Sequence, residues 1–299
     1  MKTIRSAIVT GATGVVGQAL LAELKRRQIP VFVVLHEGSR RNAAILPHPL
    51  LHTQPQSTTY DALFHLAWQG SAGAARQDAV LQQENVRRSA EAVQLARRLN
   101  CRVFVGTGSQ AECGRLHSAL TVSAGEHPEN AYGRAKSEAL YETRSLCASL
   151  GIRHIWARIL SVYGPHDRAE TLVMDSIRKF SRGISPEYTP GEQIWDFLYA
   201  QDAAEILYHL ALQGDMGVCY PVGSGEARTL RSYIEEIHTV MKATVPLRMG
   251  ALPYAAGQVM HLEADMTAVY EATGFRPAIS FAEGIRRTAA WWQAQAADV

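Results

Sequence analysis

The sequence has few cysteines, and those it has are scattered along the chain. Cys101, Cys113, Cys147 and Cys219 form no CxxC pair and do not cluster with histidines at the spacing of metal ligands. This pattern excludes a fold built on disulfides and gives no indication of a zinc site. We therefore expect four ordinary thiols and no bound metal.

The sequence also lacks a strong charge of either sign and any apolar run long enough to cross a membrane. Its 30 Lys and Arg residues against 28 Asp and Glu residues leave a net charge of +2, so the composition does not favour a polyanionic partner. The first expected strand begins at Ser6, which leaves no room for a signal peptide before it. We expect a cytoplasmic protein that binds neither nucleic acid nor membrane.

A strand, a glycine turn and a helix pattern follow one another near the N-terminus. Residues 6–10 are an apolar, β-branched run that leads into Gly11-Ala12-Thr13-Gly14-Val15-Val16-Gly17 and then into leucines at helical spacing. This order is the context that a dinucleotide site requires. Gly11 permits the tight turn, Gly14 lets the backbone approach a pyrophosphate, and Gly17 allows the helix to pack closely on the strand. The alternative is a glycine turn that binds nothing.

Strand and helix signals alternate as far as Pro165. We expect buried strands at residues 31–35, 62–67, 102–105 and 153–160, separated by helices that include residues 84–99 and Tyr132. Repeated β-α units imply a parallel sheet with helices on both faces. We predict an α/β fold with a Rossmann-type, doubly wound domain over residues 1–165 and a return segment near 196–222, in which residues 197–199 rejoin the sheet. Residues 166–195 and 223–299 are expected to form a smaller, mixed α/β substrate lobe.

Tyr132 and Lys136 are the most informative pair of side chains. They are four residues apart in a helical pattern, so they share one helix face. A free tyrosine ionises near pH 10, but a fixed cation beside its oxygen favours the phenolate. Lowering the pKa by about 3 units needs roughly 4 kcal/mol, which Lys136 and a positively charged nicotinamide could jointly supply. Such a tyrosine can exchange a proton with an alcohol oxygen, although a chance pair on a solvated helix is the alternative.

Several further motifs, in order, resemble those of the extended short-chain dehydrogenase/reductases that act on nucleotide sugars. Besides the glycine motif, Tyr132 and Lys136, they are His65-Leu66-Ala67, Asn85-Val86, Ser109, Val162-Tyr163-Gly164-Pro165, Asp202-Ala203-Ala204 and Gly223-Ser224-Gly225. The resemblance covers nearly the whole chain. It implies an NAD(P)-dependent oxidoreductase whose catalytic residues are Ser109, Tyr132 and Lys136, with Ser109 bonded to the reacting oxygen and Lys136 also holding the nicotinamide ribose.

The resemblance also implies which residues contact the ligands. The cofactor would be lined by Gly11, Thr13, Gly14, Val15, Val16, Gly17, Leu66, Ala67, Asn85, Thr107, Tyr132, Lys136, Ile159 and Leu160. The sugar nucleotide would be lined by Trp68, Gln110, Ser161, His166 and Trp195.

Several of these assignments have plain alternatives. Ser109 could simply cap a turn, His65 is better explained as a packed residue, and His166 could be an acid or an exposed turn residue. Trp195 stands where relatives often carry an arginine that grips the diphosphate, so it is either a core or a base-stacking residue.

The choice of dinucleotide depends on the end of the second strand. A carboxylate there binds the adenosine ribose, whereas arginine accommodates a 2′-phosphate. The segment here is Leu35-His36-Glu37-Gly38-Ser39-Arg40-Arg41. Because Glu37 is displaced from the strand end and Ser39-Arg40 follows, we predict NADP, bound through His36, Ser39 and Arg40, with NAD as the alternative.

Three functions are compatible with these motifs. The first is an NADPH-dependent reductase of a nucleotide-linked 4-keto-6-deoxysugar, the second is an NAD(P)-dependent 4-epimerase, and the third is a dinucleotide-sensing regulator without catalysis. The loop Ser109-Gln110-Ala111 lacks the Thr-Asp-Glu run of the family's dehydratases and the cysteine that some epimerases place at Ala111. We therefore favour the reductase, and we expect a homodimer formed through the helix of Tyr132, as in relatives.

Overall fold

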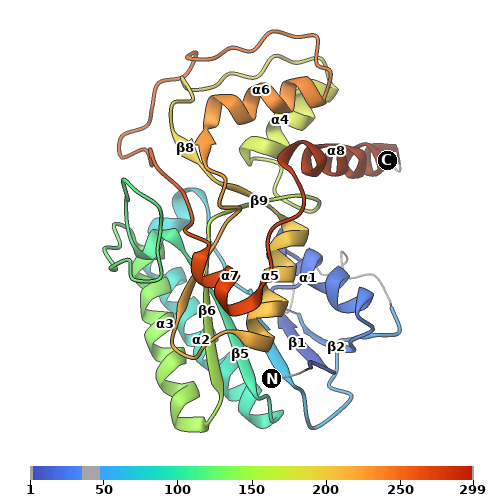
Figure 1. The fold of residues 1–299 in the computed structure, drawn as a ribbon, viewed down its shortest axis with the longest axis vertical. Helices are drawn as coiled ribbons and strands as arrows, with labels where there is room; N and C mark the ends of the chain where they lie inside the picture. The colour runs from blue at the N-terminus through green and yellow to red at the C-terminus, as the bar shows by residue number, and fades with distance from the viewer. Residues whose placement is uncertain (1–2, 36–47, 298–299) are drawn as a thin grey trace.

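The computed structural model describes residues 3–35 and 48–297, and its centre is a seven-stranded parallel sheet (Figure 1). In spatial order the strands are β10 (Cys219–Val222), β6 (Arg153–Ile159), β5 (Val103–Ser109), β4 (Ala62–His65), β1 (Ala7–Thr10), β2 (Val31–Val34) and β3 (Leu51–His52). The short β-branched runs form these strands because both faces of the sheet are covered, and β1 and β4 are buried at every position.

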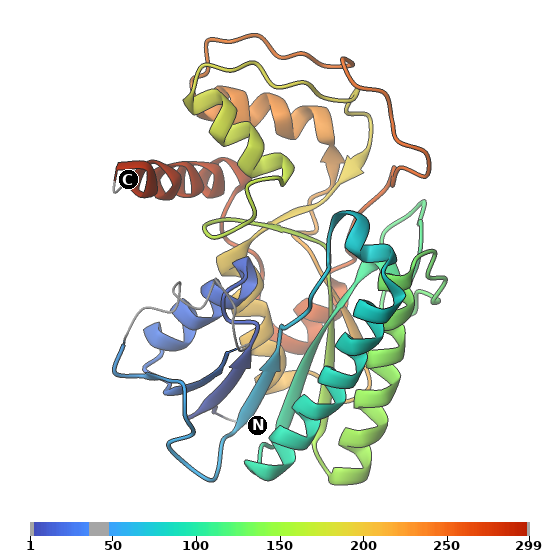
Figure 2. The ribbon, with the colours of Figure 1, turned by 180° about the vertical axis from the view of Figure 1, so that it is seen from behind.

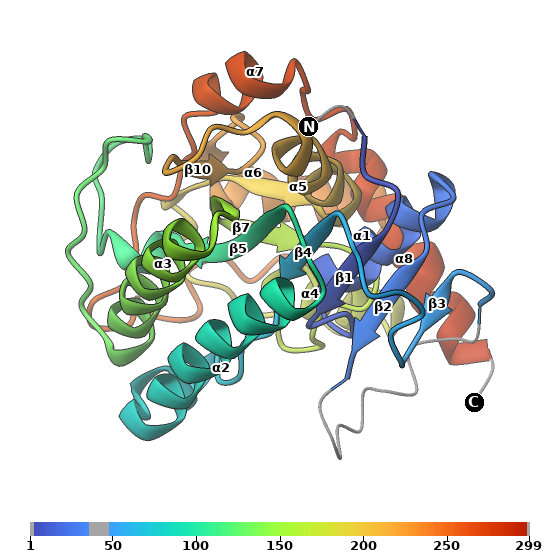
Figure 3. The same ribbon diagram turned by 90° about the horizontal axis from the view of Figure 1, so that it is seen from below.

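Helices cover both faces of the sheet, as Figure 3 shows. On one face α2 (Ala79–Arg98) packs along α3 (Ala131–Leu150). On the other, α1 (Val15–Arg26) packs on α5 (Ala200–Gln213), and α7 (Thr267–Thr273) lies against α5. Each helical layer has its own apolar core against the sheet. The doubly wound Rossmann-type fold expected from the sequence is confirmed.

The strand order reverses between β1 and β4, which defines the switch point of the sheet. Crevices at such points bind ligands outside the carboxyl ends of the strands. Gly11 follows β1 and Leu66 follows β4, so the glycine turn and the expected cofactor segment meet at this place.

A second group of elements lies beyond the carboxyl ends of the strands (Figures 1 and 2). It contains α4 (Leu172–Ser181), α6 (Leu230–Val240) and α8 (Phe281–Ala297), which share an apolar cluster. Two small sheets connect it to the Rossmann part: β7 (Ser161–Tyr163) pairs in parallel with β9 (Phe197–Tyr199), and β8 (Ile194–Trp195) pairs in antiparallel with β11 (Arg228–Thr229).

One expectation about the sheet was wrong. Residues 197–199 do not rejoin the main sheet; they form β9, and the strand that returns beside β6 is β10. The physical reason lies in Phe197, whose ring packs edge-on against Tyr233 and beside Phe281, with centroids 5.0 and 5.6 Å away. The aromatic residues that suggested a central strand instead fasten β9 to α6 and α8.

Candidate active site

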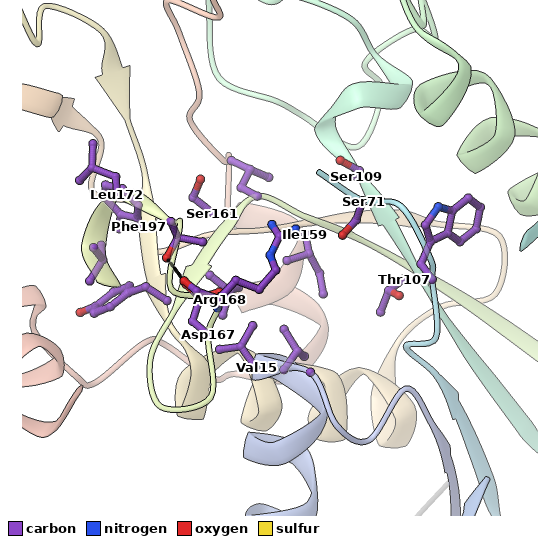
Figure 4. A pocket seen from close by; sticks show the side chains of 18 of the residues that line it. Val15, Ser71, Thr107, Ser109, Ile159, Ser161, Asp167, Arg168, Leu172 and Phe197 are labelled. Atoms are coloured by element: carbon purple, nitrogen blue, oxygen red, sulfur yellow. Dashed lines mark hydrogen bonds between the residues drawn. The ribbon is translucent and has the colours of Figure 1, made fainter. Parts of the chain in front are cut away.

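A cavity of about 650 Å³ opens between the carboxyl ends of the main sheet and the second group of elements (Figure 4). One wall is made by the glycine turn and the start of α1. A second wall comes from the end of β5 and from α3, and the third from the segment around β7, the loop that leads to α4, and β8. The cavity therefore lies at the switch point of the sheet.

The glycine turn forms a cradle in which side chains do not fit. Gly11 has a φ of +69°, and a Cβ on it would lie 2.4 Å from the backbone nitrogen of Ala67. A Cβ on Gly17 would lie 2.2 Å from the Gly11 carbonyl oxygen, whereas the nearest atom to a Cβ on Gly14 is 3.7 Å away. Among the residues that the structure describes, no side chain caps the start of α1 at Gly14. The first amides of α1 thus remain available to an anion, and the turn fits the pyrophosphate of a dinucleotide.

The start of α3 brings Tyr132 and Lys136 to the cavity. Asn130 caps this helix by accepting the Gly133 N–H at 2.8 Å, and both Tyr132 and Lys136 are buried although they line the cavity. The Lys136 ammonium donates to the Thr107 carbonyl oxygen at 2.7 Å and lies 3.7 Å from the ring centroid of Trp68. Ser109, at the end of β5, places its hydroxyl in hydrogen-bonding reach of the Tyr132 phenol.

Burial is the largest influence on the pKa of the Tyr132 phenol in the absence of a bound nicotinamide. Burial raises the pKa of Tyr132, and the Ser109 hydroxyl and the charges of Arg76 and Arg168 work against this rise. The Lys136 ammonium lies 5.9 Å from the Tyr132 ring centroid, and burial lowers its own pKa to about 7. Tyr132 is therefore a protonated phenol in this structure, which is the form that a proton donor needs.

Two arginines that the sequence analysis did not single out face the cavity. Arg76 belongs to the 3-10 turn η2 (Gly73–Gln77), and its guanidinium lies 4.3 Å from the ring centroid of Tyr132. Arg168 follows β7 and extends across the cavity (Figure 4). Both lie in loops without hydrophobic periodicity, so no sequence signal located them.

Most of the residues expected to bind cofactor or substrate line this cavity. They are Gly11, Gly14, Val15, Val16, Gly17, Leu66, Trp68, Thr107, Ser109, Tyr132, Lys136, Ile159, Leu160, Ser161, His166 and Trp195. Thr13, Ala67, Asn85 and Gln110 do not line it, and His36, Ser39 and Arg40 lie outside the described residues.

The residues set back from the cavity have structural contacts. The side-chain amide of Asn85 accepts the Gln69 N–H at 2.9 Å and donates to carbonyl oxygens of Gln69 and Leu81, which fastens the loop after β4 to α2. The Gln110 side chain donates to the Gly114 carbonyl oxygen. His65 is buried, between the Thr10 and Ser89 hydroxyls at 2.9 and 3.0 Å.

The third wall of the cavity also carries uncharged polar groups. Trp195 donates from its indole nitrogen to the Ser161 hydroxyl at 2.8 Å, and burial lowers the pKa of His166, which keeps this imidazole neutral. Gln193 is only 2% exposed, and its Oε1 has no hydrogen-bond partner among the described residues.

The described residues show neither of two other kinds of site. No three His, Cys, Asp or Glu side chains among them gather in a way that could hold a metal ion. Within the same residues, no helix combines the length and the hydropathy of a membrane span. The four cysteines are buried, free thiols.

Comparison with known proteins agrees with this geometry. Residues 7–223 match the model of the NAD dependent epimerase/dehydratase family. The chain is 25% identical to GDP-6-deoxy-D-mannose reductase of Pseudomonas aeruginosa over 96% of its own length and 97% of the relative's. It spans only about half the length of the dTDP-glucose 4,6-dehydratases it matches; that of Haemophilus influenzae is 23% identical over 58% of this chain and 55% of its own.

A solved structure extends the likeness to the fold. UDP-glucose 4-epimerase of Thermotoga maritima superposes with a TM-score of 0.86 at 20% identity, covering 97% of this chain and 99% of the epimerase. By its match to the family model over residues 7–223, the chain belongs to the NAD dependent epimerase/dehydratase family.

Proposed function

We propose that the protein is an NADPH-dependent reductase of a nucleotide-linked 4-keto-6-deoxysugar. The observation that carries this proposal is the pairing of a buried, protonated Tyr132 with Ser109 in a cavity that also contains the glycine cradle. These groups are sufficient to bind a dinucleotide and to deliver a proton to one oxygen.

The composition of the loop after Ser109 supports reduction over dehydration. Dehydration across two carbons needs a further acid and base near the sugar. In η3 (Gln110–Glu112) the Gln110 amide bonds to Gly114, Ala111 offers a methyl group, and Glu112 is fully buried behind the wall. This loop therefore adds no acid or base to the cavity.

The proposed step moves one hydride and one proton to a ketone. NADPH bound at the glycine turn would supply the hydride. The Ser109 hydroxyl orients the carbonyl oxygen, and the Tyr132 phenol donates its proton to that oxygen as the carbonyl carbon is reduced to an alcohol carbon. Lys136, held by the Thr107 carbonyl oxygen at 2.7 Å, is placed to hold the nicotinamide ribose.

The nucleotide end of the substrate needs a positive charge that Trp195 does not provide. We infer that Arg168 and Arg76, which both face the cavity, take the place of the missing arginine and bind a diphosphate. Trp195 would then contact the base.

Other parts of the proposal rest on the sequence. We propose NADP as the cofactor because of Ser39 and Arg40. We also propose that the protein is cytoplasmic and that it forms a homodimer through the face of α2 and α3. The exposed Val80 on α2 and Tyr141 on α3, 82% and 55% exposed, are the apolar groups that such a contact would cover.

A 4-epimerase is the second candidate, because the same three groups can remove a proton from an alcohol and return it. The observation that favours this alternative is that Ser109, Tyr132 and Lys136 all reach one cavity without a further base. A non-catalytic sensor is disfavoured, since a sensor needs no proton-transfer groups.

The proposal is tested by incubating the protein with a panel of nucleotide 4-keto-6-deoxysugars and NADPH while following cofactor absorbance. Stoichiometric loss of NADPH with one of these sugars is expected. Isomerisation of a nucleotide sugar without cofactor consumption would support the epimerase instead, and no reaction with any of them would contradict the substrate class.

A further inference from the structure

A fully buried carboxylate lies directly behind Ser109. Glu112 is the last residue of η3, and its Oε1 accepts the Ser109 N–H at 2.7 Å. Its Oε2 accepts from Arg158 Nε at 2.7 Å, and the Trp156 indole N–H lies 3.2 Å from both oxygens. All of these neighbours donate and none accepts, which favours an ionised carboxylate. Burial raises the pKa of Glu112 above its ordinary value, and the charge and hydrogen bond of Arg158 and the Ser109 N–H oppose that rise.

The backbone of β5 next to Ser109 lies close to the Glu112 carboxylate. A Cβ on Gly108 would lie 2.2 Å from Glu112 Oε1 and 2.2 Å from Trp156 Nε1, so this position has room only for glycine. The Ser109 hydroxyl in turn accepts the Ala111 N–H at 3.2 Å, which completes a capping box with Glu112. The backbone and the hydroxyl of Ser109 are therefore positioned by the same short turn.

The charge of Glu112 also acts on the two proton-transfer residues. Burial lowers the pKa of Lys136, and the Glu112 carboxylate opposes this effect. The same carboxylate raises the pKa of Tyr132, in addition to the rise caused by burial. Of the other groups that face this pair, Arg76 and Arg168 lower the pKa of Tyr132.

His65 also faces Lys136. Burial lowers the pKa of His65 to about 3, so its imidazole is neutral near pH 7. The carboxylate of Glu112 is thus the anionic group that acts on Lys136 in the described part of the chain.

We propose that Glu112 is a positioning residue of the site, which anchors Ser109 through its backbone and supplies the buried negative charge that acts on Lys136 and Tyr132. The inference deepens the proposed function, because it assumes that these two residues transfer or support the transfer of a proton. It does not depend on which sugar is the substrate.

The test is Glu112→Gln, which keeps an acceptor for the Ser109 N–H and removes the charge. The pH titration of the Lys136 side chain is followed by NMR of 13Cε-labelled lysine, with the signal assigned by Lys136→Arg. Burial holds the pKa of Lys136 well below the ordinary value for lysine in the parent protein, and the midpoint should fall further, by about one pH unit, in Glu112→Gln. In an activity assay the alkaline limb of kcat should move to lower pH by a similar amount.

Glu126→Gln is the matched control. Glu126 is the second carboxylate on the same arginine, with its Oε1 2.9 Å from Arg158 Nη2, and the Ser109 N–H donates to Glu112 rather than to Glu126. This variant removes one negative charge from the same buried cluster, and the Lys136 midpoint should stay where it is. If Glu112→Gln does not fold, Glu112→Asp is the second variant, because it keeps the charge but is too short to accept the Ser109 N–H. It should lower kcat without moving the midpoint of the Lys136 titration.

The outcomes separate this inference from the proposed function. An unchanged Lys136 midpoint in Glu112→Gln, or an equal shift in Glu126→Gln, would overturn the role of Glu112. A shift confined to Glu112→Gln, in a protein that reduces none of the 4-keto sugars, would uphold that role and refute the reductase.

Discussion

Among single residues, Tyr132 shows how the surroundings determine what a side chain can do. The phenol is buried against Trp68, whose ring centroid is 6.0 Å away, and beneath the Arg76 guanidinium. Burial raises its pKa more than these neighbours lower it. The residue is thus suited to giving up a proton only when negative charge develops on the substrate oxygen.

Replacing Tyr132 by Phe removes only the hydroxyl. We expect kcat to fall by roughly two to four decades while the Kd for NADPH stays within about twofold, because a positioned acid is lost and the cofactor cradle is intact. Steady-state turnover assays measure kcat, and fluorescence titration with NADPH measures the Kd. Near-normal turnover in Tyr132→Phe would refute the assignment.

Arg168 is predicted to bind the diphosphate of the substrate. Its replacement by Ala should weaken binding of the nucleotide sugar by roughly 10- to 150-fold, since a charge-assisted hydrogen bond contributes about 1.5–3 kcal/mol. Calorimetric titration with a nucleoside diphosphate and, separately, with NADPH shows which diphosphate is affected. Arg182→Ala, an exposed residue after α4, controls for the loss of charge. A larger loss for NADPH than for the nucleoside diphosphate would reassign Arg168 to the cofactor.

Cofactor preference is predicted to rest on Ser39 and Arg40. NADPH should bind more tightly than NADH, and Arg40→Ala should remove most of the difference, because the 2′-phosphate loses a charge-assisted contact of about 1.5–3 kcal/mol. Competition binding with both cofactors provides the measurement. Equal affinities in the parent protein would exclude this explanation.

On the scale of elements, β6 illustrates what the sequence could and could not predict. Its apolar, β-branched pattern predicted a buried strand at residues 153–160, and the strand runs from Arg153 to Ile159. The role of His154 within it was not predictable, because its contacts form only when β6 packs beside β5 and α3. The His154 ring lies 5.9 Å from those of both Phe104 and Trp156, and its Nε2 bonds to Thr143 Oγ1 at 2.9 Å. The apolar pattern of β6 predicts that the strand is buried, but the packing of the sheet determines which side chains contact one another.

The burial of His154 makes stability depend on pH. Burial lowers its pKa to about 3, below the value of about 6.5 in an unfolded chain, so the unfolded state binds more protons between these values and stability rises with pH. The contribution of the neutral, buried His154 to the free energy of unfolding is complete above pH 6.5 and declines as the pH falls toward 3. At pH 5 the free energy of unfolding should be about 2 kcal/mol lower because of His154. Burial of His65 lowers the free energy of unfolding in the same direction.

Urea unfolding at pH 7.5 and pH 5 measures this dependence. His154→Gln cannot titrate and keeps a partner for Thr143, so the stability difference between the two pH values should shrink by about 2 kcal/mol. His117→Gln, in the exposed loop after η3, should leave the difference as it is in the parent. A difference that does not shrink in His154→Gln would show that this histidine is not the group responsible.

At the scale of the whole molecule, the cavity joins residues from nearly every part of the chain. The glycine turn and the Tyr132-Lys136 pair could be recognised from the sequence because each is a local pattern with a fixed spacing. Arg76 and Arg168 could not, since a charged residue in a loop usually lies in solvent, and only the packing of their loops against the cavity brings these charges to the site. Glu112 stands three residues after Ser109, which is the spacing of a capping box, but its contacts with Trp156 and Arg158 depend on β6. Local patterns therefore predicted the reacting groups, whereas the charges that control them depend on long-range contacts.

The central claim is that the residues of the cavity catalyse the addition of one hydride to a single sugar carbon and of one proton to the oxygen on that carbon. The most direct measurement uses NADPH carrying deuterium at the transferable position, a nucleotide 4-keto-6-deoxysugar in ordinary water, and NMR or mass analysis of the product, with a parallel reaction in deuterated water. We predict deuterium from NADPH at one sugar carbon, one equivalent of oxidised cofactor, and no deuterium from solvent at the neighbouring carbons. Solvent deuterium at a neighbouring carbon, or an isomerised sugar with no cofactor consumed, would contradict the account.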